Sequence, residues 1–220
     1  MSHAADGGER PTKPLLAIYA DESCLGNGRE GSNPGAAAGV IEYVHPDSGN
    51  LTRWDYWVSE PATTNNRMAL RSVIEAFSGI SRKGSRFRVT FTSDSQYLVK
   101  GMGEWVYGWI GRGWKRKEGP ILNLELWMAA VDSTRGHEVE WKWVRGHEGH
   151  PQNEYANHLA TRAAREQTNS GGIVASKFDE WLAAERSKGH MAVEPEPFPT
   201  RERFRGGRQY PPFTRPTLIT

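Results

Sequence analysis

The stretch Leu15-Leu16-Ala17-Ile18-Tyr19-Ala20-Asp21 decides the fold of this chain. Its first six residues form a short, continuous apolar run, which Asp21 and a glycine-rich stretch then end. Such a run is typical of a central strand that is covered on both faces. We therefore predict that residues 15–20 form a strand in the middle of a sheet, with Asp21 at its carboxyl end.

The segments that follow this strand predict a hairpin, a helix and a further strand. Residues 39–44 and 51–59 flank the turn-like sequence PDSGN and suit a β-hairpin. The capping residues 63–66 precede apolar residues at helical spacing, which indicates an amphipathic helix. Residues 86–92 alternate and then reach Asp94, so a strand delivers a second aspartate at its carboxyl end.

The remaining elements complete an α/β pattern. We predict helices at residues 96–110 and 122–131, a strand at 139–144 and a helix at 152–166. The resulting order is three strands, a helix, a strand, helices, a strand and a helix. This order predicts a mixed sheet with helices packed on it.

Length and composition narrow the possible classes of protein. A chain of 220 residues accommodates one domain with extensions. The net charge of +2 and the sequence pI near 8.7 give no global argument for nucleic-acid binding. The single cysteine, Cys24, excludes an internal disulfide framework, and no apolar run resembles a signal peptide or membrane span. We therefore expect a cytoplasmic monomer without membrane contact.

The two ends of the chain differ from its middle. Residues 1–13 are polar and suit a disordered lead, so we place the domain at residues 14–168. Residues 169–220 are a C-terminal extension that begins with a helix-like piece at 177–186. After His190 the extension is rich in proline and arginine, and we predict that it is largely disordered. Whether its arginines contact phosphate, bind a partner or are simply solvated is left open; they are Arg201, Arg203, Arg205 and Arg208.

Aspartates at strand ends are the first signal of chemistry. In open α/β sheets, sites form at the carboxyl ends of strands. If the strands that hold Asp21 and Asp94 are adjacent and parallel, their carboxylates can share a hard divalent cation. Two such ions can stabilise the attacking and leaving oxygens of a phosphodiester displacement. A single aspartate at a strand end, however, is more often a turn or cap residue.

Four motifs in a fixed order strengthen this interpretation. They are DESCLGN at residues 21–27, TNNRM at 64–68, DSQY at 94–97 and WVRGHEGHPQNE at 143–154. Together they closely resemble the pattern of bacterial type 1 ribonuclease H over residues 15–167. The resemblance implies a five-stranded mixed sheet of order 3-2-1-4-5 flanked by helices. It also implies metal-dependent endonucleolytic cleavage of the RNA strand of an RNA/DNA hybrid.

The resemblance assigns roles to individual residues. Asp21 matches the metal-bridging aspartate of the family, and Asp94 matches its second strand-end aspartate. His147 matches a mobile histidine that assists water activation or product release. Asn157 takes the place of the last aspartate and is implied as a weak metal ligand. The implied cofactor is Mg²⁺ or Mn²⁺, as two ions. His150 matches no residue with a role in the family and is expected to be a cap or loop residue.

Three positions depart from the family pattern. Ala69 replaces a glutamate and offers no ligand atom, and asparagine at 157 keeps an oxygen but loses a charge. Glu22 stands where the family has glycine. Because side chains alternate along a strand, we expect Glu22 to point away from Asp21 unless the chain has already turned there, which leaves Glu154 as the better compensating carboxylate. We therefore predict weakened metal binding.

The resemblance also implies residues that bind substrate. Asn65 and Asn66 suit the reading of the hybrid minor groove, and they also suit helix capping. Thr64 is implied in a phosphate pocket for the DNA strand and Gln96 in a contact beside the metals. A further asparagine is implied in a phosphate contact, and the sequence leaves open whether it is Asn27 or Asn33.

Residues 105–117 combine tryptophans with basic residues and resemble the basic handle of the family. Cationic side chains there are expected to neutralise phosphates. The basic residues concerned are Arg112, Lys115, Arg116 and Lys117. Buried tryptophans more often belong to the core, and we expect Trp109 and Trp127 to do so in part.

Two functions therefore remain open from sequence. The chain is either an RNA/DNA-hybrid endoribonuclease, or a module that binds hybrids or double-stranded RNA with little cleavage because of Ala69 and Asn157. Other nucleases that share the fold lack the TNNRM and GHEGH motifs, which makes that third interpretation weaker.

Overall fold

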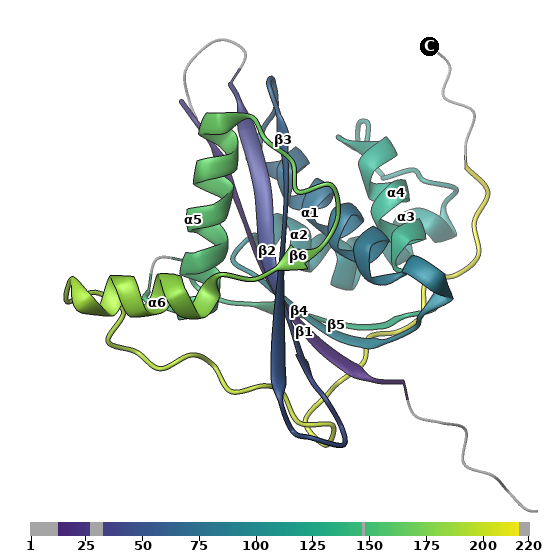
Figure 1. Ribbon diagram of the computed structural model, residues 1–220. Helices are drawn as coiled ribbons and strands as arrows, with labels where there is room; N and C mark the ends of the chain where they lie inside the picture. The colour runs from purple at the N-terminus through teal and green to yellow at the C-terminus, as the bar shows by residue number, and fades with distance from the viewer. Residues whose placement is uncertain (1–12, 27–32, 147, 216–220) are drawn as a thin grey trace, which may run out of the picture.

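The computed structural model describes residues 13–26, 33–146 and 148–215 of the chain. Its centre is a six-stranded sheet of order β5-β4-β1-β2-β3-β6 (Figure 1). The strands are β1 (Leu15–Cys24), β2 (Gly35–Val44), β3 (Leu51–Glu60), β4 (Arg88–Ser93), β5 (Glu138–Trp143) and β6 (Val174–Ala175). The mixed sheet with the order 3-2-1-4-5 is confirmed, and β6 extends it beyond β3.

The pairing around β1 places the strand ends. β1 is antiparallel to β2 and parallel to β4, with Ala20 opposite Ser93. β4 is in turn parallel to β5. Because parallel strands end at the same edge of a sheet, the residues that follow Ala20 and Ser93 emerge side by side.

Helices cover both faces of the sheet, and the alternation of β1 decides which residues contact which helix. The helices are α1 (Asn65–Ile80), η1 (Arg82–Gly84), α2 (Gln96–Lys100), η2 (Gly101–Trp105), α3 (Val106–Gly111), α4 (Leu124–Ser133), α5 (Pro151–Glu166) and α6 (Phe178–Ser187). Ile18 and Ala20 belong to the main core with α1 and α4, whereas Ala17 and Tyr19 pack with α5 and α6. The apolar run of β1 is thus buried on both sides, as its sequence predicts.

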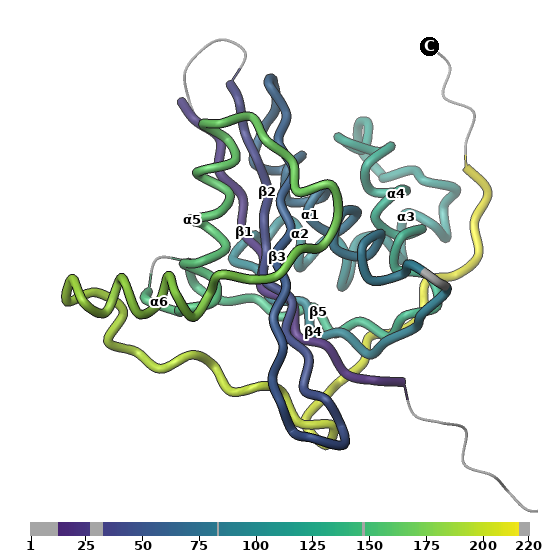
Figure 2. The backbone as a smooth tube through the Cα atoms, viewed as in Figure 1, coloured from purple at the N-terminus to yellow at the C-terminus, as the bar shows by residue number. Residues whose placement is uncertain are grey.

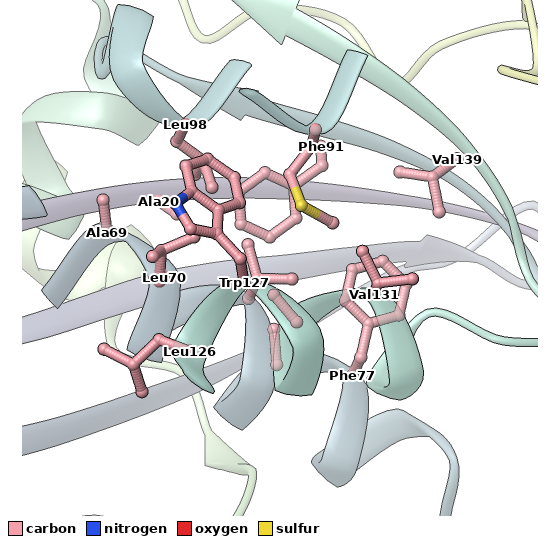
Figure 3. Packing of buried hydrophobic residues seen from close by; sticks show 14 of the residues in the cluster. Ala20, Ala69, Leu70, Phe77, Phe91, Leu98, Leu126, Trp127, Val131 and Val139 are labelled. Carbon is pink, nitrogen blue, oxygen red and sulfur yellow. The ribbon is translucent and has the colours of Figure 1, made fainter. Parts of the chain in front are cut away.

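The helix that we predict at residues 96–110 is interrupted by the π-helical turn η2. A Cβ added at Gly101 would lie 1.9 Å from a ring carbon of Trp127. The buried indole, shown in Figure 3, therefore occupies the space of a side chain at position 101. Glycine is the residue that lets the helix pass the indole at this distance.

The C-terminal extension packs against the domain. The expected short helix is confirmed as α6, but the prediction of a largely disordered tail after His190 is wrong for the residues that the structure describes. The Gly207 N–H donates to Val139 O at 2.7 Å, and the Tyr210 hydroxyl donates to Met102 O at 2.8 Å. In Figure 2 the tail runs from α6 to the side of β5 and then toward α3. The sequence suggested disorder because few of its residues are apolar, yet main-chain hydrogen bonds and scattered aromatics attach it to a surface formed by other elements.

Within residues 13–26, 33–146 and 148–215, no helix has the length and apolar character needed to cross a bilayer.

We predict that Gly101→Ala destabilises the fold. The added methyl group must displace Trp127, and overpacking of this kind costs about 1–3 kcal/mol. Urea unfolding measures the change. Gly103→Ala is the matched control, because no atom lies within 4 Å of a Cβ there and alanine favours a helix. Equal unfolding free energies for the two variants would contradict the steric explanation.

Candidate active site

Three carboxylates converge at the carboxyl ends of β1 and β4. Asp21, Glu22 and Asp94 each offer an oxygen, and these oxygens all lie within 4.8 Å of one another. The Glu22 N–H donates to Asp21 Oδ1 at 2.7 Å. The parallel pairing of Ala20 with Ser93 produces this meeting, as the strand-end argument predicts.

Glu22 belongs to the cluster, so our expectation that it faces away from the site is wrong. The alternation itself holds: Asp21 follows Tyr19 on the α5 side of β1, and Glu22 follows Ala20 on the α1 side. β1 runs to Cys24, beyond the predicted end at residue 20, but its pairing with β4 ends at Ala20 and Ser93, and past that point both side chains come within reach of Asp94. The unusual acid next to Asp21 was the available sequence signal, but strand alternation does not fix how far a long glutamate side chain reaches toward Asp94.

Ala69 lies in the main core on the α1 side of the sheet. Its side chain is fully buried in the same cluster as Ala20, and Figure 3 shows it among those side chains. It supplies no ligand atom, as its sequence implies. A carboxylate from β1 therefore enters the site from the α1 side, the side on which the family pattern has its helix glutamate.

The cluster is electrostatically strained. Asp21 is only 5% exposed, and burial followed by repulsion from Asp94 raises the pKa of Asp21 well above its usual range. Burial and the charges of Asp21 and Asp94 likewise raise the pKa of Glu22. A hard dication prefers oxygen ligands and would offset this repulsion. The donor set therefore fits a divalent metal.

Helix α5 is fixed against the end of β1. The Asn153 side chain donates to Ala20 O at 3.4 Å, and Thr161 Oγ1 donates to Ser23 Oγ at 3.2 Å. Thr161 Oγ1 also lies 3.4 Å from Asn157 Oδ1, which places Asn157 on the α5 face that borders β1. The Asn157 side chain is half-buried there. The charge of Glu154 raises the pKa of Asp21, which places Glu154 near the cluster without making it a member. The role of Asn157 as a ligand stays a prediction.

The loop before α5 contacts Asp94. A Cβ on Gly146 would lie 2.2 Å from Asp94 Oδ2, so a larger residue at this motif position would displace the Asp94 carboxylate. The Trp143 indole donates to Asp94 O at 3.0 Å. His147 lies outside the described residues, and its assigned role stays a prediction. His150 caps α5 by accepting from the Asn153 N–H, which confirms the expectation of a cap.

The residues expected to bind substrate surround the start of α1. Thr64, and neither asparagine, is the N-cap of α1, because its side chain accepts from the Arg67 N–H. Asn66 is exposed, while the buried Oδ1 of half-buried Asn65 has no hydrogen-bond partner among the described residues. Gln96 is exposed two residues after Asp94 and accepts from Lys100 at 3.1 Å.

Asn33 is the candidate asparagine that the structure describes. Its carbonyl accepts from the Thr63 N–H at 2.9 Å, which places it at the approach to α1. Asn27 lies outside the described residues.

The basic handle is exposed around a buried tryptophan. Its four cationic side chains are exposed as expected, and Arg112 Nε donates to Lys115 O at 3.1 Å. The side chains are those of Arg112, Lys115, Arg116 and Lys117. Trp127 is fully buried and Trp109 packs against the core, which confirms their partly structural role. Trp114 is also buried, so it anchors the handle to the core.

The sheet order and the carboxylates at the ends of β1 and β4 define an α/β nuclease of the ribonuclease H-like class. The RNase H family model matches residues 13–165, and the chain belongs to this family of hydrolases. Ribonuclease H of Pelobacter propionicus is 41% identical over 156 residues, which cover 70% of this chain and 88% of that protein. Ribonuclease H of Methylococcus capsulatus is 38% identical over 74% of this chain and 98% of that protein.

A solved structure extends the similarity to the C-terminal extension. LC9-RNase H1, a type 1 RNase H with the type 2 active-site motif, is 58% identical, with a TM-score of 0.87. The match covers 95% of this chain and 100% of that chain. The PFV RNase H domain, at 17% identity and a TM-score of 0.55, shares the fold.

We predict that Glu22→Gln stabilises the metal-free protein. A buried carboxylate with a raised pKa destabilises the fold at neutral pH, so its neutralisation is expected to add about 1 kcal/mol, or roughly 2–4 °C in Tm. Calorimetry in a chelator measures this. The Mg²⁺-induced rise in Tm is expected to shrink in the same variant. The exposed Glu104→Gln is the control, and an undiminished Mg²⁺ effect in Glu22→Gln would exclude Glu22 from the metal site.

Proposed function

We propose that the chain is a metal-dependent endoribonuclease that cleaves the RNA strand of RNA/DNA hybrids. The observation that carries the proposal is the group of three carboxylates whose oxygens lie within 4.8 Å of one another. In this proposal Asp21, Glu22 and Asp94 hold the metal, and Asn157 is a neutral fourth ligand. Glu22 supplies the charge that Ala69 lacks.

The relatives support this proposal in two ways. The two relatives described above carry the name Ribonuclease H. LC9-RNase H1, which is 58% identical, combines the type 1 fold with a type 2 active-site motif. A family member can thus carry a different acidic motif on the type 1 fold. This favours the interpretation that Glu22 takes over the carboxylate that Ala69 lacks, over the interpretation that the carboxylate is simply lost.

The chemistry of the site follows from its donors. Two bound Mg²⁺ or Mn²⁺ ions would supply an activated water and charge stabilisation at the leaving oxygen. The paired strands position Asp21 and Asp94, because the two residues directly follow Ala20 and Ser93. The backbone at Gly146 also packs closely against the Asp94 side chain. His147 is proposed to handle protons or product beside them. The residues therefore orient the scissile phosphate at the sheet edge.

The substrate surface extends from the site over α1 to the handle. Exposed Asn66 can donate and accept hydrogen bonds with base edges and sugar hydroxyls in the minor groove, and half-buried Asn65 lies next to it. Thr64 lies at the N-terminus of α1, where backbone N–H groups favour a phosphate of the DNA strand. The handle adds cations at a second contact.

We expect the protein to cleave a labelled RNA/DNA hybrid in Mg²⁺ or Mn²⁺. Glu22→Gln is expected to lower kcat by about 100-fold, or about 2.7 kcal/mol. Gel analysis of single-turnover reactions measures this. Retained hybrid binding without cleavage by the unmodified chain would instead establish the binding module.

Ala69→Glu is the matched companion variant. The substitution puts a second carboxylate into a fully buried position beside an intact cluster, so it is expected to destabilise the fold by about 2 kcal/mol or more without raising kcat. Asn157→Asp differs from Ala69→Glu because it restores a charge at a position that is only half-buried. Faster cleavage by Ala69→Glu would contradict the compensation by Glu22.

We predict that the double variant Lys115→Ala/Arg116→Ala weakens hybrid binding and leaves kcat unchanged. Each lost phosphate contact is expected to flatten the slope of log affinity against log salt by about 1. Fluorescence anisotropy across a salt series measures the slope. Lys188→Ala, an exposed cation at the C-terminal end of α6 that pairs with Glu185, is the control. An unchanged slope would exclude the handle from phosphate binding.

A further inference from the structure

Glu196, in the C-terminal tail, joins both ends of the loop that precedes α5. Its carboxylate accepts from Lys142 Nζ on β5 and from His150 Nε2, the latter at 2.9 Å. Its backbone forms a reciprocal pair with the side chain of Gln152: Gln152 Nε2 donates to Glu196 O at 2.8 Å, and the Glu196 N–H donates to Gln152 Oε1 at 3.1 Å. Gln152 is fully buried, so this attachment is part of the interior.

The contact with Glu196 selects the state of His150 that caps the helix. His150 Nδ1 accepts from the Asn153 N–H at 3.4 Å, so this nitrogen must carry no proton. The proton of the ring then lies on Nε2 and is donated to Glu196. A carboxylate at this position thus fixes the tautomer that α5 needs at its N-terminus. The hydrogen bond from His150 and the ion pair with Lys142 hold the pKa of Glu196 at about 2, which keeps it ionised.

Two contacts carry this anchoring to the end of β1. The ring of His150 packs on Tyr19, with centroids 5.4 Å apart. Asn153, which is 2% exposed, donates to Ala20 O at 3.4 Å. Ala20 directly precedes Asp21. The first turn of α5 is therefore held between the tail and the strand that delivers the acidic cluster.

We propose that Glu196 is a positioning residue for the active site: it fixes His150 as the cap of α5 and thereby holds Glu154 and Asn157 in place relative to Asp21. The match to the family model ends at residue 165, so this residue lies outside the family domain. The kinetic part of the inference rests on the proposed function, whereas the anchoring of α5 does not.

The kinetic test compares Glu196→Ala with Glu196→Gln in the full chain. Glu196→Ala is expected to lower kcat about tenfold and to raise the Mg²⁺ concentration for half-maximal rate, with KM for the hybrid within about twofold. Glu196→Gln keeps an acceptor for His150 and is expected to recover part of the loss. Glu194→Gln is the control, because Glu194 is 82% exposed and pairs with Arg186 at the surface.

Hydrogen exchange of the metal-free protein gives a readout that needs no activity. Loss of the cap is expected to speed exchange at the Asn153 and Glu154 amides about five- to tenfold, with the central strands unchanged. The double variant with His150→Ala is expected to add little to the effect of Glu196→Ala. If the unmodified chain does not cleave hybrids, the proposed function fails, and exchange together with Mg²⁺ titration calorimetry still decides the role of Glu196.

Three results would overturn the inference. The first is unchanged exchange at Asn153 and Glu154 in Glu196→Ala. The second is faster exchange throughout the protein, which would make Glu196 a general stabilising residue. The third is a rise in KM with kcat unchanged, which would assign Glu196 to substrate binding.

Discussion

The parallel pairing of β1 with β4 is the constraint on which the rest of the site depends. It places Ala20 opposite Ser93, so Asp21, which continues in β1, lies beside Asp94, which follows the end of β4. Burial on both faces of β1 fixes this register, because a shift by one residue would exchange its α1 and α5 faces. The core thus sets the distance between two groups that repel each other, and the stability of the sheet offsets that repulsion.

The position of the third carboxylate shows how one fold accommodates a changed acidic set. Glu22 lies on the α1 side of β1, and Ala69 belongs to the core cluster on that same side of the sheet. A short side chain at 69 and a long one at 22 are complementary, because a glutamate at both positions would place a further charge in a buried region.

The C-terminal extension is part of the domain surface. Its main chain pairs with Val139 and with Gln152, and its side chains reach His150 and the underside of the handle. Phe213 packs on Trp114 of the handle with ring centroids 4.8 Å apart. The C-terminal extension thus contacts His150, which caps the helix beside the acidic site, and Trp114, which is the buried residue of the handle.

The sequence by itself determined the order of elements, the central strand, the two strand-end aspartates and the family, because periodicity and motif spacing are local properties. Through the family resemblance it also pointed to Asn66 and the handle cations as substrate contacts, and these side chains are exposed. The participation of Glu22, the π-turn at Gly101 and the attachment of the tail were decided by tertiary structure alone. Each depends on which residues from distant segments come together: Asp94 with Glu22, Trp127 with Gly101, and His150 with Glu196.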